Sequence, residues 1–598
     1  MNTLITIRIR DLSKSYEDRV LFENFSMDIY TGDRIGIVGP NGTGKTTLLK
    51  LLIGDLEPDK GYVEIFGKIG YLPQDLILPE DIPVKEYFKI SEPSPILRRM
   101  NLRKDIFDSP CGTLSGGEKI KLKLIEILED KPSIIILDEP TNHLDMRGIE
   151  TLEEELGKFD GTLLIVSHDR FLLDKAINKV IEIDRGKISI YKGNYTYYSE
   201  KKKEELGRAW EEYEDYINER KRLKEASRRA KERAISTGRV NERKDSFCRY
   251  GKDFYGKKAS KIAKVGKAIE KRIERLEVKE KPFEEQHIKV DFSTSDEIPD
   301  TIIQCKDLVK SFGDKLLFKN VNLSTKNGQK IALLGDNGVG KTTLLRIFLG
   351  KEKATAGSIW ISQSARIGYL EQEINLLNPE NTIIDEVKGD AKSDITTIRT
   401  LLGCLLFIED EVLKPIKSLS MGEKVRVTLA KLILGGFNIL LMDEPTNFLD
   451  INSREVIEEA LKWYRGSLIF VSHDRYFVSK VADTIWEIEN CGITVYPGDY
   501  EYYLFKKSRL KDGDIKDKIL LLEVQLSKIS SELDRAKDTE KEELNKSFLA
   551  LIKEINRLKA MIRYIELYPT LFRWNEMRKD DEQAVQMTLY PTLFRWTL

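Results

Sequence analysis

Two glycine-rich stretches of the chain have the residue types and the spacing of a phosphate-binding loop. Residues 39–46 read GPNGTGKT and residues 335–342 read GDNGVGKT, so both fit the pattern G-x-x-x-x-G-K-S/T. Each stretch follows an apolar run typical of a strand and precedes one typical of a helix, which is the context that this pattern requires. The glycines let backbone N–H groups close around phosphate oxygens, and the lysine neutralises phosphate charge. We therefore expect two nucleotide sites, formed by Gly39, Asn41, Gly42, Gly44, Lys45, Thr46 and Thr47 and by Gly335, Asn337, Gly338, Gly340, Lys341, Thr342 and Thr343.

Two apolar runs that end in Asp-Glu would supply the carboxylates of such sites. Residues 134–139 read IIILDE and residues 440–444 read LLMDE, which predicts buried strands that present both acids at their carboxyl ends. The first acid of each pair would hold Mg²⁺ through water, with the threonine of the phosphate loop, and the second would polarise an attacking water. The predicted chemistry is phosphoryl transfer to water, with Glu139 and Glu444 as catalytic residues and Thr46, Asp138, Thr342 and Asp443 at the metal.

The motifs occur twice in the same order, so the chain contains an internal repeat. LSGGE at residues 114–118 is matched by LSMGE at 419–423, and SHDR at 167–170 is matched by SHDR at 472–475. The two phosphate-loop lysines lie 296 residues apart, whereas the two Asp-Glu pairs lie 305 apart, so the second copy has about nine extra residues between these motifs. Each copy closes on a similar segment, YKGNYTYYSEKK or YPGDYEYYLFKK. These observations predict two α/β domains, at residues 1–198 and 300–506.

Taken together, the motifs resemble those of the ATP-binding-cassette (ABC) superfamily, and the match spans both domains. In that family LSGGE is the signature motif, the SHD histidine is a switch residue, and the glutamine of YLPQD or YLEQE touches metal and water. The resemblance implies a switch role for His168 and His473, metal contacts for Gln74 and Gln372, and adenine stacking on Tyr16 and Phe312. It also implies nucleotide contacts from the signature residues Ser115, Gly116, Gly117, Glu118, Ser420, Gly422 and Glu423.

ABC cassettes pair head to tail with ATP between them, so the resemblance implies two composite sites. The first composite site joins Lys45, Gln74, Asp138, Glu139 and His168 to Ser420 and Gly422. The second composite site joins Lys341, Gln372, Asp443, Glu444 and His473 to Ser115 and Gly117. Met421 departs from the family pattern, because it stands where the first signature glycine is expected and its side chain could crowd the γ-phosphate. We therefore expect the two sites to be inequivalent.

Composition limits the remaining possibilities. The 598 residues exceed what a single core usually holds, and the net charge is −1. No run of 18 apolar residues occurs, so we expect no transmembrane helix, and the N-terminus lacks the apolar stretch of a secretory signal. The five cysteines are scattered singly, which favours a reducing compartment over a disulfide framework or a zinc site. The expected location is the cytoplasm.

The segment between the domains, at residues 199–285, has the pattern of a basic helical hairpin. Apolar residues at 206, 210, 213 and 217 and at 262, 265, 269, 273 and 276 have the spacing of two amphipathic helices, which predicts an antiparallel coiled coil with a longer arm of about 55 Å. Gly238 and Gly251 are expected to end the helices at the tip. Residues 220–272 contain 20 Lys or Arg against 6 Asp or Glu, which favours RNA phosphates. The tip predicted to stack on and contact RNA is Phe247, Arg249, Tyr250, Lys252, Phe254, Tyr255, Lys257 and Lys258.

Two fused cassettes, this long joining segment and the sequence DEPTNHLD resemble the ABC-F family of ribosome-binding ATPases. In that family the linker enters the ribosomal exit site beside the P-site tRNA, so the implied partners are that tRNA and ribosomal RNA up to the peptidyl-transferase centre. The long tip, Phe448 in PTNFLD and the short spacing from Gln74 to Ser115 resemble the branch that confers resistance to lincosamides, pleuromutilins and streptogramin A. The resemblance implies displacement of the tRNA, release on ATP hydrolysis, and a monomer away from the ribosome.

Other functions stay open at the level of sequence. A housekeeping ABC-F translation factor that rescues stalled ribosomes would share the motifs. An ATPase partner of a separate membrane transporter would share the cassettes, although the charged linker argues against it. A DNA-repair ATPase would use the basic hairpin on DNA, and a solvated stalk would only space the cassettes.

The C-terminal region predicts further helices. Apolar residues from 515 to 533 and from 544 to 558 repeat at spacings of three and four, which indicates a second helical hairpin at residues 511–562. The tail at 563–598 contains LYPTLFRW twice, at 567–574 and 589–596. We assign no functional site to this tail.

Overall fold

The computed structural model divides into two compact units, one of residues 1–482 with 486–494 and one of residues 483–485 with 495–598. It describes residues 4–16, 19–88, 95–100, 102, 106–184, 186–243, 249–279, 281, 299–371, 377–390, 394–407, 409–507, 522 and 551–552. The hairpin predicted at 511–562 and the tail at 563–598 lie outside the described residues, apart from positions 522, 551 and 552.

The first cassette contains two sheets. An antiparallel sheet has the order β2-β1-β4, from β1 (Ile5–Tyr16), β2 (Arg19–Tyr30) and β4 (Lys60–Ile65). A six-stranded sheet has the order β5-β6-β7-β3-β8-β9, from β3 (Arg34–Val38), β5 (Ile69–Leu72), β6 (Ile134–Asp138), β7 (Thr162–Val166), β8 (Lys179–Asp184) and β9 (Lys187–Lys192). Its first five strands pair in parallel, and β9 is antiparallel to β8. Every residue of β6 and β7 is buried, as the continuous apolar runs predict for strands covered on both faces.

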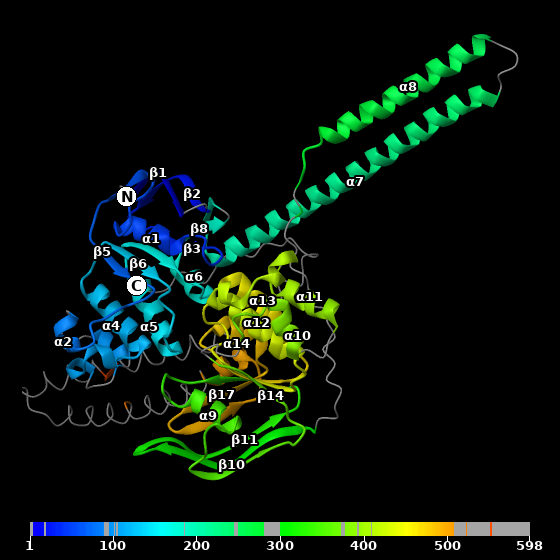
Figure 1. Ribbon diagram of the computed structural model, residues 1–598. Helices are drawn as coiled ribbons and strands as arrows, with labels where there is room; N and C mark the ends of the chain where they lie inside the picture. The colour runs from blue at the N-terminus through cyan, green and yellow to red at the C-terminus, as the bar shows by residue number, and fades with distance from the viewer. Residues whose placement is uncertain are drawn as a thin grey trace, which may run out of the picture. The chain divides into compact units, whose positions relative to one another are not determined.

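Helices connect these strands (Figure 1). They are α1 (Lys45–Ile53), α4 (Gly116–Glu129), α5 (Met146–Gly157) and α6 (Arg170–Ala176), with the short α2 (Val84–Tyr87) and α3 (Pro95–Arg99). Helix α1 follows β3 through the phosphate loop, and its four leucines are buried against the sheets. The helix therefore begins where the parallel strands end, which is the edge where α/β folds bind ligands.

The second cassette repeats this arrangement. Its antiparallel sheet has the order β11-β10-β13, from β10 (Thr301–Phe312), β11 (Lys315–Lys326) and β13 (Ala356–Ile361). Its larger sheet has the order β14-β15-β16-β12-β17-β18, from β12 (Lys330–Leu334), β14 (Ile367–Leu370), β15 (Ile439–Asp443), β16 (Ser467–Val471), β17 (Thr484–Glu489) and β18 (Gly492–Tyr496). The predicted pair of α/β cassettes is confirmed.

The helices of the second cassette follow the same order, and two of them are much longer than their counterparts. They are α9 (Lys341–Phe348), α10 (Ile383–Asp390), α11 (Ile395–Cys404), α12 (Met421–Leu434), α13 (Ile451–Trp463) and α14 (Arg475–Val481). With 8 and 10 residues, α10 and α11 are twice as long as α2 and α3, which have 4 and 5. The extra residues of the second copy thus lengthen helices that precede the signature motif.

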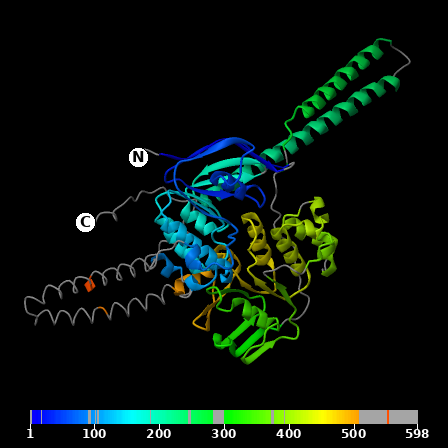
Figure 2. The same ribbon diagram turned by 60° about the vertical axis from the view of Figure 1, so that its left-hand side comes forward.

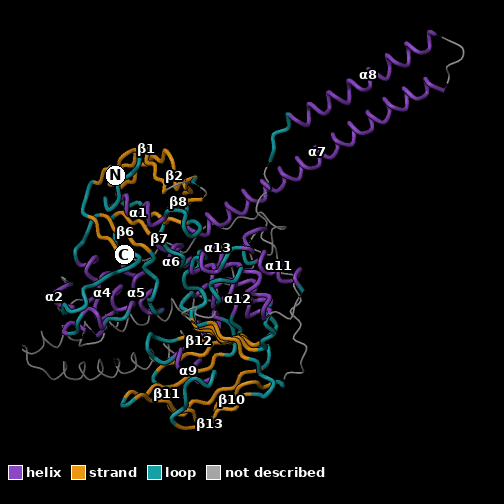
Figure 3. The backbone as a smooth tube through the Cα atoms, in the orientation of Figure 1, coloured by secondary structure: helices purple, strands orange, loops and turns teal. Residues whose placement is uncertain are grey.

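Two long helices between the cassettes form the predicted hairpin. Helix α7 spans Tyr195–Arg243 and α8 spans Arg249–Glu274. They lie side by side in both views (Figures 1 and 2) and are drawn as uninterrupted helix in Figure 3. The 49 residues of α7 correspond to about 73 Å, which is longer than predicted.

The prediction that Gly238 and Gly251 end the helices was wrong, because each glycine lies inside a helix. One glycine lowers the stability of a helix by only about 1 kcal/mol, and the flanking Arg, Lys and Glu residues, which favour the helix, offset that loss. The segment between the two helices, 244–248, lies outside the described residues.

Ion pairs between the two arms fix their antiparallel register. Lys279 lies 3.2 Å from Glu212, Arg272 lies 3.5 Å from Glu219, and Lys231 pairs with Glu270. Leu223 and Ser227 of α7 are buried between the arms. The predicted seam was wrong at Leu206 and Val265, which are 40% and 55% exposed. Val265 instead lines an open groove between the arms, together with Ile262 and Ile269 of α8 and with arginines and alanines of α7.

None of the helices in the described part of the chain is long and apolar enough to cross a membrane.

Candidate functional site

The two phosphate loops have a backbone that only glycine accommodates easily. Gly39 and Gly335 have φ of 151° and 150°, and a Cβ at these positions would lie 2.2 Å and 2.9 Å from the carbonyl oxygens of Ile183 and Ile488. Gly44 and Gly340, which precede the helices, also have left-handed backbone. Each loop therefore closes tightly onto the neighbouring strand, β8 or β17, and ends at a helix N-terminus that favours anions.

The lysine of each loop lies across its own loop. Lys45 Nζ donates to the carbonyl oxygens of Gly39 and Pro40 at 2.8 and 3.0 Å, and Lys341 Nζ donates to those of Gly335 and Asp336 at 2.8 and 3.1 Å. Burial lowers the pKa of both lysines from the ordinary value, against the opposing charges of the nearby carboxylates. A phosphate group held by the loop would offset this cost of burial, which fits the predicted nucleotide.

The predicted metal ligands meet in pairs at the carboxyl ends of β6 and β15. Asp138 and Asp443 are 1% and 3% exposed, and burial raises the pKa of each carboxyl while the hydroxyl of Thr46 or Thr342 opposes that rise. A buried carboxylate beside a hydroxyl is an oxygen donor set of the kind that Mg²⁺ uses together with phosphate and water. The described residues contain no group of three or more His, Cys, Asp or Glu arranged for a metal, so the ion would depend on the nucleotide for its remaining ligands. Gln74 is exposed, and Gln372 lies outside the described residues.

The two predicted catalytic glutamates have a strained backbone. Glu139 and Glu444 have φ of 51° and 52°, a left-handed conformation that residues other than glycine seldom adopt. The backbone N–H of Glu139 donates to Val166 O at 2.8 Å, and that of Glu444 donates to Val471 O at 3.0 Å. In each cassette the left-handed backbone turns away from the strand directly after the aspartate. The carboxylates of the aspartate and the glutamate are therefore held in different positions.

Each glutamate contacts the histidine predicted to act with it. His168 Nε2 lies 3.2 Å from Glu139 Oε1, and His473 Nε2 lies 3.3 Å from Glu444 Oε1. The backbone N–H of each histidine also faces the second oxygen of its glutamate, at 3.3 and 3.4 Å. Burial raises the pKa of Glu139 to about 7 and also raises that of Glu444, while it lowers the pKa of His473 to about 3 and that of His168 well below the usual range. The imidazoles are therefore neutral near pH 7.

The second composite site is a cavity of about 490 Å³ lined by both cassettes. The second cassette contributes Phe312, Lys341, Thr342, Asp443, Glu444 and His473, and the first contributes the signature residues Ser115, Gly116 and Gly117 with the loop from Thr141 to Leu144. Asn337 Nδ2 donates to His143 O across the interface at 3.0 Å. The structure thus brings together the described residues that the head-to-tail pairing predicts. Phe312 is half exposed at the edge of this cavity, as a residue that stacks on a base would be.

The first composite site has corresponding contacts across the interface. Asn41 Nδ2 donates to Phe448 O at 3.0 Å, and the Asn41 backbone N–H donates to Asp450 Oδ2 at 3.0 Å. A Cβ at Gly422 would lie 3.7 Å from Asn41 Nδ2, and one at Gly117 would lie 3.5 Å from Asn337 Nδ2, so both signature helices face the opposite phosphate loop in the same manner. Tyr16 is 48% exposed, close to the value for Phe312.

Each signature helix begins with a capping box. Ser115 Oγ accepts from Glu118 N at 3.3 Å while Glu118 Oε2 accepts from Ser115 N at 2.9 Å, and Ser420 with Glu423 repeats both bonds. The predicted signature glutamates therefore cap their own helix, a role that the sequence prediction of nucleotide contact did not include.

Met421 follows Ser420 in this helix and is 37% exposed. At its counterpart Gly116, a Cβ would lie 3.4 Å from the ring of His143.

The structure adds residues that the motif search did not assign. Asp145 and Asp450, which end the sequences TNHLD and TNFLD, each bond to the backbone N–H of the asparagine in the opposite phosphate loop. Arg147 reaches from the first cassette to Asp336 at 3.2 Å and Glu489 at 2.9 Å. The duplicated aspartate was visible in the sequence, but its partner was not, because that partner lies about 190 residues away or more.

The basic tip predicted to contact RNA is only partly described. Phe247 lies outside the described residues, and Arg249, Tyr250, Lys252, Phe254 and Tyr255 have a helical backbone at the start of α8. Lys257 and Lys258 are exposed on the same helix.

Comparison with known proteins matches the cassettes and the segment between them. One family model, described as ABC transporter, matches residues 22–142 and 318–447, and an extension model with the same description matches residues 181–292. The ribosome protection protein VmlR of Bacillus subtilis is 32% identical over 559 residues, covering 92% of this chain and 98% of VmlR. This chain belongs to the ABC-F family. The ABC-F protein is therefore an ATPase.

Two further relatives extend the comparison. The energy-dependent translational throttle protein EttA of Escherichia coli is 30% identical over 552 residues, covering 82% of the ABC-F chain and 94% of EttA. A solved structure titled RNase-L Inhibitor aligns with a TM-score of 0.54 at 21% identity, covering 82% of this chain and 89% of the other. At that identity the structural likeness supports the fold of two tandem cassettes.

Proposed function

We propose that this ABC-F protein is a cytoplasmic, ribosome-binding ATPase that protects the ribosome from antibiotics bound at the peptidyl-transferase centre. The observation that carries the proposal is a long basic hairpin inserted between two cassettes that share composite sites. Residues 220–272 contain 20 Lys or Arg against 6 Asp or Glu, in a chain whose net charge is −1. Such a local excess attracts an RNA backbone through counterion release. The likeness to the ribosome protection protein VmlR over nearly the whole chain also supports this proposal.

In the proposed cycle the two composite sites close on ATP and set the hairpin in its ribosome-bound position. Thr46 with Asp138 and Thr342 with Asp443 would each hold a Mg²⁺ ion, which would neutralise charge on the γ-phosphoryl group of ATP. Glu139 and Glu444 orient the attacking water, and His168 and His473 hold the glutamates in place. Hydrolysis opens the sites and releases the protein. Off the ribosome we expect a monomer.

The hairpin is proposed to enter the exit site, displace the P-site tRNA and reach towards the drug pocket. Helix α7, at about 73 Å, gives the hairpin the length to carry its tip well away from the cassettes. Aromatic and basic residues at the tip, from Phe247 to Lys258, suit unpaired bases and phosphates. We propose lincosamides, pleuromutilins and streptogramin A as the drugs concerned.

A housekeeping role in translation is the second candidate, and the likeness to EttA favours it. The cassettes and their sites would be the same in both roles. The two roles differ in whether the protein changes drug susceptibility.

Ribosome binding is tested with the double variant Glu139→Gln, Glu444→Gln, which should bind ATP without hydrolysing it. We expect the full-length variant to sediment with ribosomes through a sucrose cushion in ATP and to stay in the supernatant in ADP. Glu154→Gln, a change of an exposed glutamate of α5, is the matched control and should sediment as the wild type does. Absence of the double variant from the ribosomal fraction in ATP would contradict the proposal.

Protection is tested by drug susceptibility of cells with and without the wild-type gene. Alanine at Phe247, Arg249, Tyr250, Phe254 and Tyr255 should abolish protection and leave the ATPase rate intact. Alanine at the exposed acids Glu211, Glu214 and Asp215 of α7 is the matched control and should preserve both. Ribosome binding without any change in susceptibility would favour the housekeeping role, and protection that survives the tip substitutions would make the tip a spacer.

A further inference from the structure

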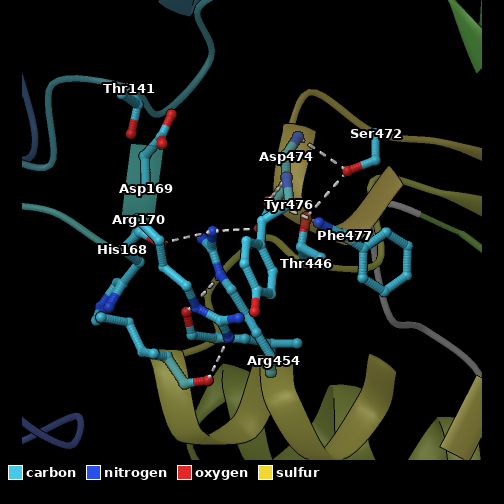
Figure 4. A network of polar contacts seen from close by, with 12 residues as sticks. Thr141, His168, Asp169, Arg170, Thr446, Arg454, Ser472, Asp474, Tyr476 and Phe477 are labelled. Carbon is cyan, nitrogen blue, oxygen red and sulfur yellow. Dashed lines mark hydrogen bonds and ion pairs between the residues drawn. The ribbon is translucent and has the colours of Figure 1, made fainter. Parts of the chain in front are cut away.

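One buried arginine at the interface between the cassettes has contacts on both sides. Arg454 lies in the first turn of α13 and is 8% exposed. Its Nε donates to Leu449 O at 3.1 Å, and its Nη1 donates to Asp474 Oδ2 at 2.8 Å, both within the second cassette. The same Nη1 donates to His168 O of the first cassette at 3.2 Å. Figure 4 shows the side chain between the loop of His168 and the helix that begins after Asp474.

The partners of Arg454 place it between two switch loops. Asp474 directly follows His473 and caps α14 by accepting from the backbone N–H groups of Tyr476 and Phe477, each at 3.0 Å. His168 holds the corresponding place before α6. A single planar guanidinium therefore joins the loop that carries the histidine of one site to the loop that carries the histidine of the other.

One other set of charged contacts at this interface occurs twice, in keeping with the internal repeat. Arg170 reaches Glu455 at 3.5 Å and Glu458 at 3.4 Å, and its counterpart Arg475 pairs with Glu153 in the opposite direction. Each of these arginines also lies over an aromatic ring of the opposite cassette, at 4.2 Å for Arg170 on Tyr476 and 5.2 Å for Arg475 on Phe171. These pairs hold the cassettes together without distinguishing one composite site from the other.

Arg454 is different because its counterpart in the repeat, 305 residues earlier, is Ile149. Ile149 is 2% exposed and belongs to the apolar core of the first cassette. Asp169, the counterpart of Asp474, is approached instead by Arg475 of the second cassette at 3.6 Å. The bridge through Arg454 thus runs in one direction, from the second cassette onto the switch loop of the first.

The backbone that Arg454 holds is the one that orients the first catalytic pair. The His168 N–H donates to Glu139 Oε2 at 3.3 Å, and its ring Nε2 lies 3.2 Å from Glu139 Oε1. Because a displacement of about 1 Å at a reacting group lowers a rate by as much as a hundredfold, a bond that fixes this loop affects hydrolysis without contacting ATP.

We propose that Arg454 is a positioning residue that fixes the switch loop of His168 from the opposite cassette, and so controls turnover at the first composite site. The inference rests on the catalytic roles proposed for Glu139 and His168 and is independent of ribosome binding. It predicts that ATP hydrolysis at the first site depends on the contact that Arg454 makes between the two cassettes.

The kinetic test uses the full-length protein with one site silenced. In the Glu444→Gln background the remaining turnover comes from the Glu139 site, and Arg454→Met should lower its kcat at least fivefold while KM for ATP changes less than twofold. Arg454→Lys, which keeps the charge near Asp474, should retain more of the rate than Arg454→Met. In the Glu139→Gln background Arg454→Met should lower kcat by a smaller factor than in the Glu444→Gln background, although the side chain also borders the cavity of the second site. Equal loss in both backgrounds, or a change carried by KM, would overturn the inference.

A second measurement does not depend on residual ATPase activity. Hydrogen exchange in the nucleotide-free Arg454→Met variant should become faster at residues 168–172 and stay as in the wild type across α1. The matched control is Arg34→Met, because Arg34 donates to three backbone carbonyl oxygens, those of Leu156, Phe159 and Ala176, all within the first cassette. That variant should leave kcat in the Glu444→Gln background unchanged. Unaltered exchange at 168–172 in Arg454→Met contradicts the inference. If Glu444→Gln is inactive but exchange at 168–172 is faster in Arg454→Met, the contact of Arg454 with the His168 loop is supported. The proposal that the Glu139 site turns over on its own is then rejected.

Discussion

The two composite sites contain the same catalytic parts, yet they differ in what the opposite cassette contributes. Both have a glycine-lined phosphate loop, an aspartate with a threonine, and a left-handed glutamate beside a neutral histidine. The second site receives Gly116 and His143 from its partner cassette, whereas the first site receives Met421, Phe448 and the bridge from Arg454. The two copies share the side chains that act on a cassette's own nucleotide, whereas some residues offered across the interface differ, as Gly116 and Met421 do. We therefore expect the turnover of each site to depend on side chains of the opposite cassette as well as on its own catalytic residues.

The largest effect is expected from exchanging the signature residues. Gly116→Met in the Glu139→Gln background should lower turnover of the second site by roughly tenfold, because a side chain whose Cβ lies 3.4 Å from the His143 ring must displace that ring or enter the cavity. Met421→Gly in the Glu444→Gln background should raise turnover of the first site. Steady-state phosphate release measures both. If neither exchange alters a rate, the signature residue is not the source of the difference.

A smaller effect should separate the two equivalent ion pairs Arg475–Glu153 and Arg170–Glu458, which cross the interface. Glu153 and its partner Arg475 are both below 10% exposed, and the arginine with Lys175 holds the pKa of Glu153 below its usual value despite burial. Glu153→Gln leaves Arg475 without that charge, and breaking a buried pair costs about 3 kcal/mol. Glu458→Gln on the other pair should cost less, because its contact with Arg170 is longer, at 3.4 Å.

Urea unfolding of the two variants at pH 8 measures this difference. Equal losses would show that the two pairs are equivalent. The matched control is Glu154→Gln on the same helix as Glu153, which should leave the midpoint unchanged.

The smallest effect is a pH dependence carried by Glu458. Burial raises the pKa of this carboxyl to about 7, against the lowering effect of Arg170, and the nearby acids Asp474 and Glu455 raise it further. Between pH 4.5 and 7 the folded protein therefore binds more protons at this site than the unfolded chain, so the site's contribution to stability falls as pH rises through that window. Relative to wild type, Glu458→Gln should become more stable as pH increases from 5 to 7.5. Thermal unfolding at several pH values checks it, and a constant difference would contradict the assignment.

Much of this architecture was predictable from local patterns. The phosphate loops, the Asp-Glu strands and the duplicated order specified two α/β cassettes, because these motifs depend on residues that are close in sequence. The hairpin was also predicted, although the helices do not end at Gly238 and Gly251, since helix propensity over many residues outweighs one glycine. Val265 was placed in a buried seam because spacing shows which face of a helix a residue takes, and not how closely the opposite arm packs on that face.

The contacts across the interface could not be predicted from local sequence patterns. Arg454 bonds to a carbonyl oxygen 286 residues away, and a backbone acceptor has no sequence signature. The signal that was present is the mismatch between Arg454 and Ile149 at equivalent positions of the repeat. Comparing the two copies position by position would have singled out that arginine, but not its partner.

The most direct test of unequal sites is to measure ATP turnover in Glu139→Gln and Glu444→Gln separately, in the full-length protein under identical conditions. The structure predicts that Glu444→Gln loses the larger share, since it silences the site that retains the signature glycine Gly116 and leaves the site that contains Met421. A loss at least threefold greater in Glu444→Gln than in Glu139→Gln would support this account. Equal losses in the two variants would contradict it.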